Sequence, residues 1–410
     1  MSSASIPSAG PAWRTPLMVI LAGCLIATVG FGIRSVFGLF LDPMTLARGW
    51  DRETFALAMA IQNLLWGAAV PIAGALADRY GPSRVLALGA VVYGAGVWGM
   101  AEAESGLGLH LFGGVLTGLG VAFTAFSLAM AAMAKAVGPE RRSLVLGLGT
   151  AAGSFGQVVF SPLGQGFIAA FGWQPALLIL AAIALVIIPL AFVLPSDTSA
   201  KGEALSDQTI VQALREATGH RGFVLLTIGF FVCGFHVAFI TVHFPAYAQD
   251  LGLAAEVGAY SIAIIGLFNI LGSFLSGAAG QRWSKKCGLS FIYFARAICI
   301  LALLFAPKTA LTLYLFAAAM GILWLSTVPL TTGIVAQVFG VRYMATLFGV
   351  VFFSHQIGSF IGIWLGGYLY DTTGSYDAIW WAGVVLGVAA AVVHLPINER
   401  PLARLGIQPT

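Results

Sequence analysis

Residues 74–84 read GALADRYGPSR and separate two long apolar stretches of the chain. Small apolar residues fill the start of this segment, and Asp78, Arg79 and Arg84 surround a Gly81-Pro82 turn. Apolar runs of at least ~18 residues recur on both sides, and each is long enough to cross ~30 Å of hydrocarbon as a helix. Because 59% of the 410 residues are hydrophobic and only 9% are charged, the sequence predicts many membrane-spanning helices.

Twelve such apolar stretches follow one another, and residues 74–84 lie between the second and the third. The runs are apolar on every face, whereas a strand of a membrane barrel alternates in polarity over ~10 residues, so we expect helices. The predicted spans are 16–41, 54–77, 85–103, 108–134, 143–170, 175–194, 222–248, 258–280, 288–306, 309–338, 344–370 and 378–396.

Lysine and arginine predict the orientation, because they stay on the cytoplasmic side of short loops. Placing the N-terminus inside puts fifteen of the twenty on that side and only Arg48, Arg52 and Lys308 in outer loops, while Arg34 and Arg296 lie within helices. We therefore expect a multi-pass protein of the cell membrane, with both termini cytoplasmic. The membrane is expected to be a bacterial inner membrane. The net charge of +4 is an orientation signal and gives no indication of nucleic-acid binding.

An internal duplication accompanies the helices. The polar stretch 195–221 divides them six and six, which predicts an N-terminal bundle (1–194), a cytoplasmic linker (195–221) and a C-terminal bundle (222–410). Segment 74–84 aligns with 277–287, GAAGQRWSKKC, and segment 146–164 aligns with 348–366 at nearly the same offset. The predicted fold is an all-α membrane protein with twelve transmembrane helices in two six-helix bundles, related by a parallel repeat.

The opening segment resembles the loop between helices 2 and 3 of the major facilitator superfamily, and the helix count and the repeat agree with that family. The residues that carry the resemblance are Gly74, Leu76, Asp78, Arg79, Gly81 and Arg84. The resemblance implies a cytoplasmic latch made by Asp78, Arg79 and Arg84, with Arg282 in the second copy. A merely solvated turn is the alternative, but it does not account for the helix-side glycines or for the second copy.

Polar residues inside the predicted helices are few, and no Asp or Glu lies in the middle of one. Residues 30–40, GFGIRSVFGLF, resemble helix 1 of the monocarboxylate transporter branch, where a basic residue followed by Ser is linked to substrate and proton binding. Arg34 and Ser35 take those places. An arginine clamps a carboxylate with two parallel hydrogen bonds but does not carry the coupled proton, unlike the Lys that the branch usually has.

Other candidates for the substrate site come from the helices that line the cavity in the superfamily, and from positions where this sequence differs from the monocarboxylate transporter branch. The branch has a basic residue in helix 8, where this chain offers only Asn269. Trp324 of helix 10 is a candidate for lining the wall of the substrate cavity. His236 and His355 lie near the centres of helices 7 and 11 and are candidates for substrate binding and proton coupling, although neutral packing is an alternative. His243 is either a gate or an interfacial residue, and Arg296 is expected to be structural or to snorkel inward.

The sequence thus predicts a secondary transporter of a small organic anion, with a monocarboxylate as the leading candidate, working by alternating access and by symport if protons are coupled. The alternative is a proton-driven exporter of drugs or hydrophobic metabolites; against it, Gly114 stands where such antiporters carry an arginine. We expect no enzyme, because no nucleophile is paired with a base and no phosphate loop or metal-ligand cluster occurs. A monomer in the lipid bilayer, without cofactor, metal or nucleic acid, is expected.

Overall fold

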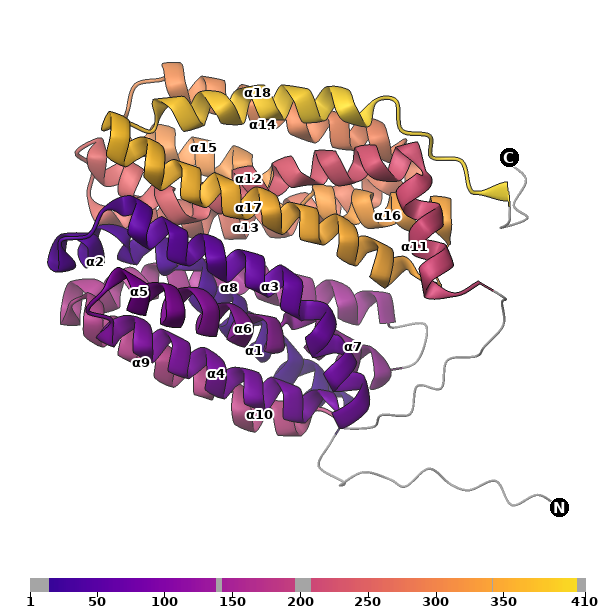
Figure 1. Cartoon of the computed structure of the whole chain (residues 1–410), viewed down its shortest axis with the longest axis horizontal. Helices are drawn as coiled ribbons and strands as arrows, with labels where there is room; N and C mark the ends of the chain where they lie inside the picture. The colour runs from indigo at the N-terminus through magenta and orange to yellow at the C-terminus, as the bar shows by residue number, and fades with distance from the viewer. Residues whose placement is uncertain (1–14, 138–141, 196–207, 341, 404–410) are drawn as a thin grey trace.

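The computed structural model describes residues 15–137, 142–195, 208–340 and 342–403, and these parts of the chain are helical without strands. The long helices run side by side (Figure 1). We call the end of the bundle where α1 begins and α18 ends the proximal end. The opposite end, where α2 and the start of α3 lie, is the distal end.

Each predicted span is a helix or a row of helical segments, with ends within three residues of the prediction except in the first. The N-terminal half contains α1 (Pro16–Ser35), η1 (Phe37–Phe40), α2 (Leu41–Arg48), α3 (Arg52–Tyr80), α4 (Pro82–Glu102), α5 (Gly106–Leu109), η2 (His110–Leu116), α6 (Thr117–Phe123), α7 (Phe126–Lys135), α8 (Arg142–Phe171), α9 (Trp173–Leu185) and α10 (Ile187–Val193). The C-terminal half contains α11 (Ile210–Gly219), α12 (Arg221–Asp250), α13 (Ala255–Arg282), α14 (Lys285–Phe305), α15 (Ala310–Leu323), α16 (Thr327–Phe339), α17 (Met344–Thr373) and α18 (Asp377–His394).

Eleven spans within the described residues are long and apolar enough to cross a membrane. The remaining predicted span, 143–170, is the 30-residue helix α8. The first span is longer than predicted, since it continues from Pro16 to Arg48. Asp42 and Pro43 interrupt its apolar run, but both fall in the first turn of α2. A proline is tolerated there, because the backbone nitrogens of the first turn donate no hydrogen bond within the helix. Gly49, with φ of 67°, then ends α2 in the left-handed conformation.

The buried apolar side chains form two clusters. One comes almost entirely from residues 19–194, with a few members from α12, α13 and α17, and the other comes from residues 217–397. Inside the halves, α1 packs along α8 and α12 packs along α17; between them, α3 packs on α17 and α8 packs on α13. Two bundles therefore meet along two helix pairs (Figure 1).

The repeat is visible as a matching pair of close backbone contacts. A methyl group on Gly156 of α8 would overlap the carbonyl oxygen of Thr28 in α1, and one on Gly358 of α17 would overlap that of Phe231 in α12. The two glycines are 202 residues apart in number and the two carbonyl residues 203. Helices also break at matching places, between α6 and α7 in one half and between α15 and α16 in the other.

Candidate functional site

Arg34 lies near the middle of the first span, one residue before α1 ends. Its Nη2 donates a hydrogen bond to Oδ1 of Asn63 on α3, with a distance of 2.6 Å between the two atoms. The amide nitrogen of Asn63 donates to the carbonyl oxygen of Met59 at 2.8 Å, which turns Oδ1 toward the arginine. The guanidinium is thus held by a neutral oxygen.

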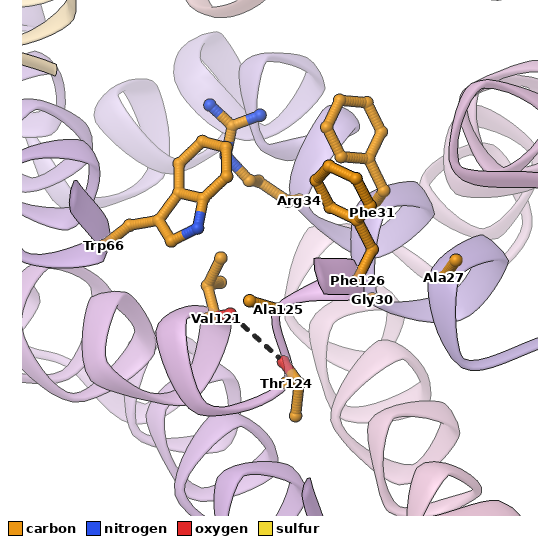
Figure 2. Close-up of a pocket in the computed structure, with 9 residues that line it drawn as sticks. All are labelled: Ala27, Gly30, Phe31, Arg34, Trp66, Val121, Thr124, Ala125 and Phe126. Carbon is orange, nitrogen blue, oxygen red and sulfur yellow. Dashed lines mark hydrogen bonds between the residues drawn. The ribbon is translucent and has the colours of Figure 1, made fainter. Parts of the chain in front are cut away.

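Aromatic rings form the rest of its surroundings. The Cζ atom of Arg34 lies 4.3 Å from the centre of the Trp66 ring and 5.6 Å from that of Phe31. Figure 2 shows the guanidinium beside the indole, with Phe31 and Phe126 on the other side of the cavity. Between described residues, the ion pairs of this structure all involve Arg52, so Arg34 has no carboxylate partner there. A cation at this depth is costly unless an anion or water accompanies it.

Two small cavities flank this guanidinium. The first, of about 20 Å³, belongs to the N-terminal half and is lined by Ala27, Gly30, Phe31, Arg34, Trp66, Val121, Thr124, Ala125 and Phe126 (Figure 2). The second, of about 10 Å³, lies between the halves and is lined by Arg34, Phe37, Met59, Gln62, Asn63, Ala238, Thr241, Val242 and Ile363. Each has room for about one water. An organic molecule needs the helices to move apart.

His355 reaches the Arg34 site from the other half through an aromatic contact. Its ring stacks on Phe352, with centroids 5.6 Å apart, and Phe352 meets Trp66 edge to face at 5.5 Å. The neighbouring Gln356 donates from Nε2 to the carbonyl oxygen of Asn63 at 2.8 Å. His355 is therefore connected to the Arg34 site only through Phe352, and it lines neither of the two cavities.

Ser35 and His236 point elsewhere. The hydroxyl of Ser35 donates to the carbonyl oxygen of Gly32 in its own helix at 2.7 Å. The Nε2 atom of His236 lies 2.8 Å from the carbonyl oxygen of Gly383 on α18, at the outer side of the C-terminal half. Neither side chain lines either of the two cavities at Arg34.

Asn269 and Trp324 lie at the break between α15 and α16. Asn269 donates from Nδ2 to Ser154 Oγ of the other half at 2.9 Å, and its Oδ1 accepts from the backbone nitrogen of Leu325 at 3.0 Å. The carbonyl oxygen of Trp324 accepts a hydrogen bond from the buried Arg296. All three residues hold the broken helix in place, which agrees with the structural role expected for Arg296.

The predicted latch residues lie at the proximal end. Asp78, Arg79, Arg84 and Arg282 are exposed, and no ion pair joins any of them to another described residue. Arg79 lies over the ring of the adjacent Tyr80, 5.1 Å from its centre. The latch is not closed in this conformation and stays a prediction for another one.

A cluster at the distal end was missed by the sequence analysis. Arg52, the first residue of α3, contacts Oδ1 of Asp42 at 2.8 Å and binds both carboxylate oxygens of Asp250 in the other half at 2.6 and 2.8 Å. Its Nη1 also donates to the hydroxyl of Tyr376 at 3.0 Å, and its Cζ lies 3.8 Å from the centre of the Tyr370 ring. We call Asp42, Arg52, Asp250 and Tyr376 the distal gate. The available signal was the position of Arg52 in an outer loop, against the charge bias.

Asp371 adds a second link beside the distal gate. Its two carboxylate oxygens, at the end of α17, accept from the backbone nitrogens of Arg52 and Glu53 at 3.2 and 2.6 Å. A residue of one half thereby caps the helix N-terminus of the other, where a negative charge is favourable. Glu53 in turn accepts from Nε1 of Trp364 at 2.9 Å.

The remaining polar links between the halves lie at mid-depth. They join Asn63 to Gln356 and Ser154 to Asn269, and between described residues no hydrogen bond or ion pair joins the halves nearer the proximal end. Between described residues, polar links therefore join the two halves at the distal end and at mid-depth, and none of these links lies nearer the proximal end.

Comparisons with known proteins agree with this architecture. The family model of the Major Facilitator Superfamily matches residues 20–363. An uncharacterized MFS-type transporter, YcxA of Bacillus subtilis, is 24% identical and covers 95% of this chain and 97% of its own. Monocarboxylate transporter 13 of Rattus norvegicus is 25% identical over 91% of this chain and 85% of its own, and Monocarboxylate transporter 11 of Mus musculus is 27% identical over 91% and 84%.

Among solved structures, a bacterial homolog of the human lysosomal transporter Spinster superposes with a TM-score of 0.71 at 16% identity, covering 94% of this chain and 96% of that one. At that identity the likeness concerns the fold. The family model covers most of the chain, the helices form two repeated bundles, and the chain belongs to the major facilitator superfamily of membrane transporters.

Proposed function

We propose that this transporter carries a small organic monocarboxylate across the cell membrane by alternating access, with Arg34 binding the carboxylate. The observation that carries the proposal is the Arg34 guanidinium, which lies deep in the bundle beside two cavities. Its hydrogen bond and ring contacts among the described residues are with a neutral oxygen and with aromatic rings. Its planar group offers two parallel donors to a carboxylate. An anionic substrate would supply the missing negative charge.

The number of cations favours one carboxylate over two. Among the described residues, Arg34 is the only charged residue that lines either cavity. The fully buried Arg296 donates instead to the carbonyl oxygens of Leu323 and Trp324. A second carboxylate would be buried without a partner, which is unfavourable. The rings of Phe31 and Trp66 suit the apolar part of such a substrate. The names of the monocarboxylate transporters among the relatives point in the same direction.

The two ends of the bundle would act as alternating gates. With the proximal end cytoplasmic, as the charge bias predicts, this conformation is sealed toward the exterior by the distal gate. Closing the proximal latch at Asp78, Arg79, Arg84 and Arg282 would accompany opening of the distal gate. A substrate that binds one conformation more tightly than the other shifts this equilibrium.

Uptake into liposomes that contain the purified protein tests the proposal. A series of monocarboxylates and dicarboxylates of equal chain length is compared, and the monocarboxylates are expected to be transported. The Arg34→Gln variant should lose this uptake, and Arg34→Lys should retain part of it, because a lysine keeps the charge but not the paired donors. Arg48→Gln is the matched control, since Arg48 lies in α2 over Trp173 and far from both cavities.

Normal uptake by Arg34→Gln would refute the assignment. Transport of lipophilic cations that does not depend on Arg34 would instead support the exporter alternative.

A further inference from the structure

His243 lies directly behind the distal gate, fully buried in α12. Its Nδ1 is 3.0 Å from the hydroxyl oxygen of Tyr376, and its Nε2 is 2.8 Å from the carbonyl oxygen of Ile363 on α17. The ring stacks on Phe239 with centroids 5.4 Å apart. Both ring nitrogens therefore have partners, and one of them is a member of the gate.

These partners define one protonation state. The carbonyl oxygen of Ile363 only accepts, so Nε2 carries a hydrogen. Tyr376 accepts from Nη1 of Arg52 and gives its own hydrogen to Nδ1. Burial raises the pKa of the Tyr376 hydroxyl, which therefore keeps the proton that it donates. The chain Arg52 to Tyr376 to His243 to Ile363 is complete only when the imidazole is neutral.

A proton on Nδ1 would break this chain in the closed gate. The nitrogen would become a donor that faces the hydroxyl hydrogen of Tyr376, and no other acceptor bonds that hydroxyl among the described residues. The imidazolium would also share Tyr376 with the cation of Arg52. The carboxylates near the gate are Asp42, Glu53, Asp250, Asp371 and Asp377. Among the described residues none of them bonds the ring, whose two nitrogens meet Tyr376 and Ile363.

We propose that His243 is the residue through which protons control the opening of the distal gate, by binding a proton at Nδ1 when Tyr376 withdraws. The inference rests on the proposed transport cycle only in that the gate must open for the substrate to bind. When the gate opens, water reaches the ring and Nδ1 takes up a proton. Before the gate closes, Nδ1 returns the proton to water and again accepts from Tyr376.

Linkage gives the direction and the size of the effect. The closed gate binds fewer protons at this site than the open gate, so acid favours the open gate. An imidazole in water titrates near pH ~6.5, and if only the open gate accepts the proton, a fall from about pH 8 to about pH 5.5 raises the ratio of open to closed molecules about tenfold. This response needs no substrate.

Electron-spin distance measurements on the full chain in lipid nanodiscs test the proposal without substrate. Labels are attached to Leu46→Cys in α2 and Ala254→Cys before α13, both exposed residues at the distal end of opposite halves, with Cys24, Cys287 and Cys299 replaced by Ala. The fraction of long distances is expected to rise as the pH falls. His243→Gln, which keeps one donor and one acceptor but does not titrate, should lose this response. Tyr376→Phe should show long distances at both pH values.

His110→Gln is the matched control. His110 also lies near the distal end and contacts α3, with Nε2 3.0 Å from the carbonyl oxygen of Thr54, but it has no part in the chain to Arg52. This variant should keep the response to pH. A pH response that persists in His243→Gln, or its absence from the unaltered protein, would overturn the proposal. Failure of the anion assignment would instead appear as a lack of carboxylate uptake with the pH response intact.

Discussion

Replacing Asp250 by Asn is expected to loosen the distal gate without disturbing either bundle. Asp250 ends α12 and receives two hydrogen bonds from Arg52 of the other half, at 2.6 and 2.8 Å. The side chains of Arg52 and Asp250 are 12% and 27% exposed, so the pair is partly screened by water. The substitution keeps the shape of the side chain but removes its charge and one acceptor.

The size of the effect follows from this geometry. A hydrogen bond to a charged group contributes ~1.5–3 kcal/mol, and partial exposure places this pair at the low end. Loss of about 1.5 kcal/mol from the distal-closed state raises the ratio of open to closed molecules about tenfold. Arg52→Gln removes the contact with Asp42 as well, so its effect should be larger.

The labelled pair Leu46→Cys and Ala254→Cys provides the assay, at neutral pH. The fraction of long distances should rise in Asp250→Asn, and adding Asp250→Asn to Arg52→Gln should produce little further change, because both remove the same interaction. Arg48→Gln is the control, since Arg48 faces Trp173 of its own half. Unchanged distances in Asp250→Asn, or an equal change in Arg48→Gln, would refute this account of the gate.

Three further predictions concern packing and capping. Gly156→Ala should lower the temperature of thermal unfolding, because its methyl group would overlap the Thr28 carbonyl and such overpacking costs ~1–3 kcal/mol. Gly166→Ala in the same helix should leave this temperature unchanged, because a methyl group there meets open space. Equal shifts in the two variants would contradict the contact between Gly156 and Thr28. In Asp371→Ala the ratio of open to closed molecules at the labelled distal end should rise about fivefold, because a helix cap contributes ~1 kcal/mol. A distance distribution identical to that of the unaltered chain would argue against the cap. Asn269→Ala should lower the unfolding temperature by removing bonds to Ser154 and Leu325, an effect of ~1–3 kcal/mol, and a stability equal to that of the unaltered chain would exclude this role.

Much of the fold could be predicted from the sequence because a bilayer imposes a local rule. Every backbone group in hydrocarbon must be bonded within its own segment, so a long apolar run is a helix whatever surrounds it. The spans confirm this, and the exception is informative: the run that ends near residue 41 continues as helix to Arg48, since Asp42 and Pro43 suit a first helical turn. Local polarity marks where a run leaves the apolar layer, but not where its helix ends.

The site was predicted less completely, because orientation around a helix axis depends on the neighbouring helices. Arg34 was found from its charge in an apolar run, which needs no partner to be conspicuous. Ser35 is its neighbour in sequence, yet its hydroxyl bonds Gly32 within α1. The His236 ring contacts Gly383 of α18, whereas the His355 ring stacks on Phe352, which meets Trp66 of the other half.

The sequence by itself determined the helices, the repeat, the family and the presence of Arg34 within an apolar run, because each depends on residues that are close in the chain or on a pattern that occurs twice. Only the tertiary structure decided which end is sealed. Arg52 meets Asp250 across 198 residues and Asp371 across 319, and no local pattern records such pairs. Whether a charge near a membrane surface is a solvated end or half of a gate depends on the other bundle, which places the carboxylate within reach.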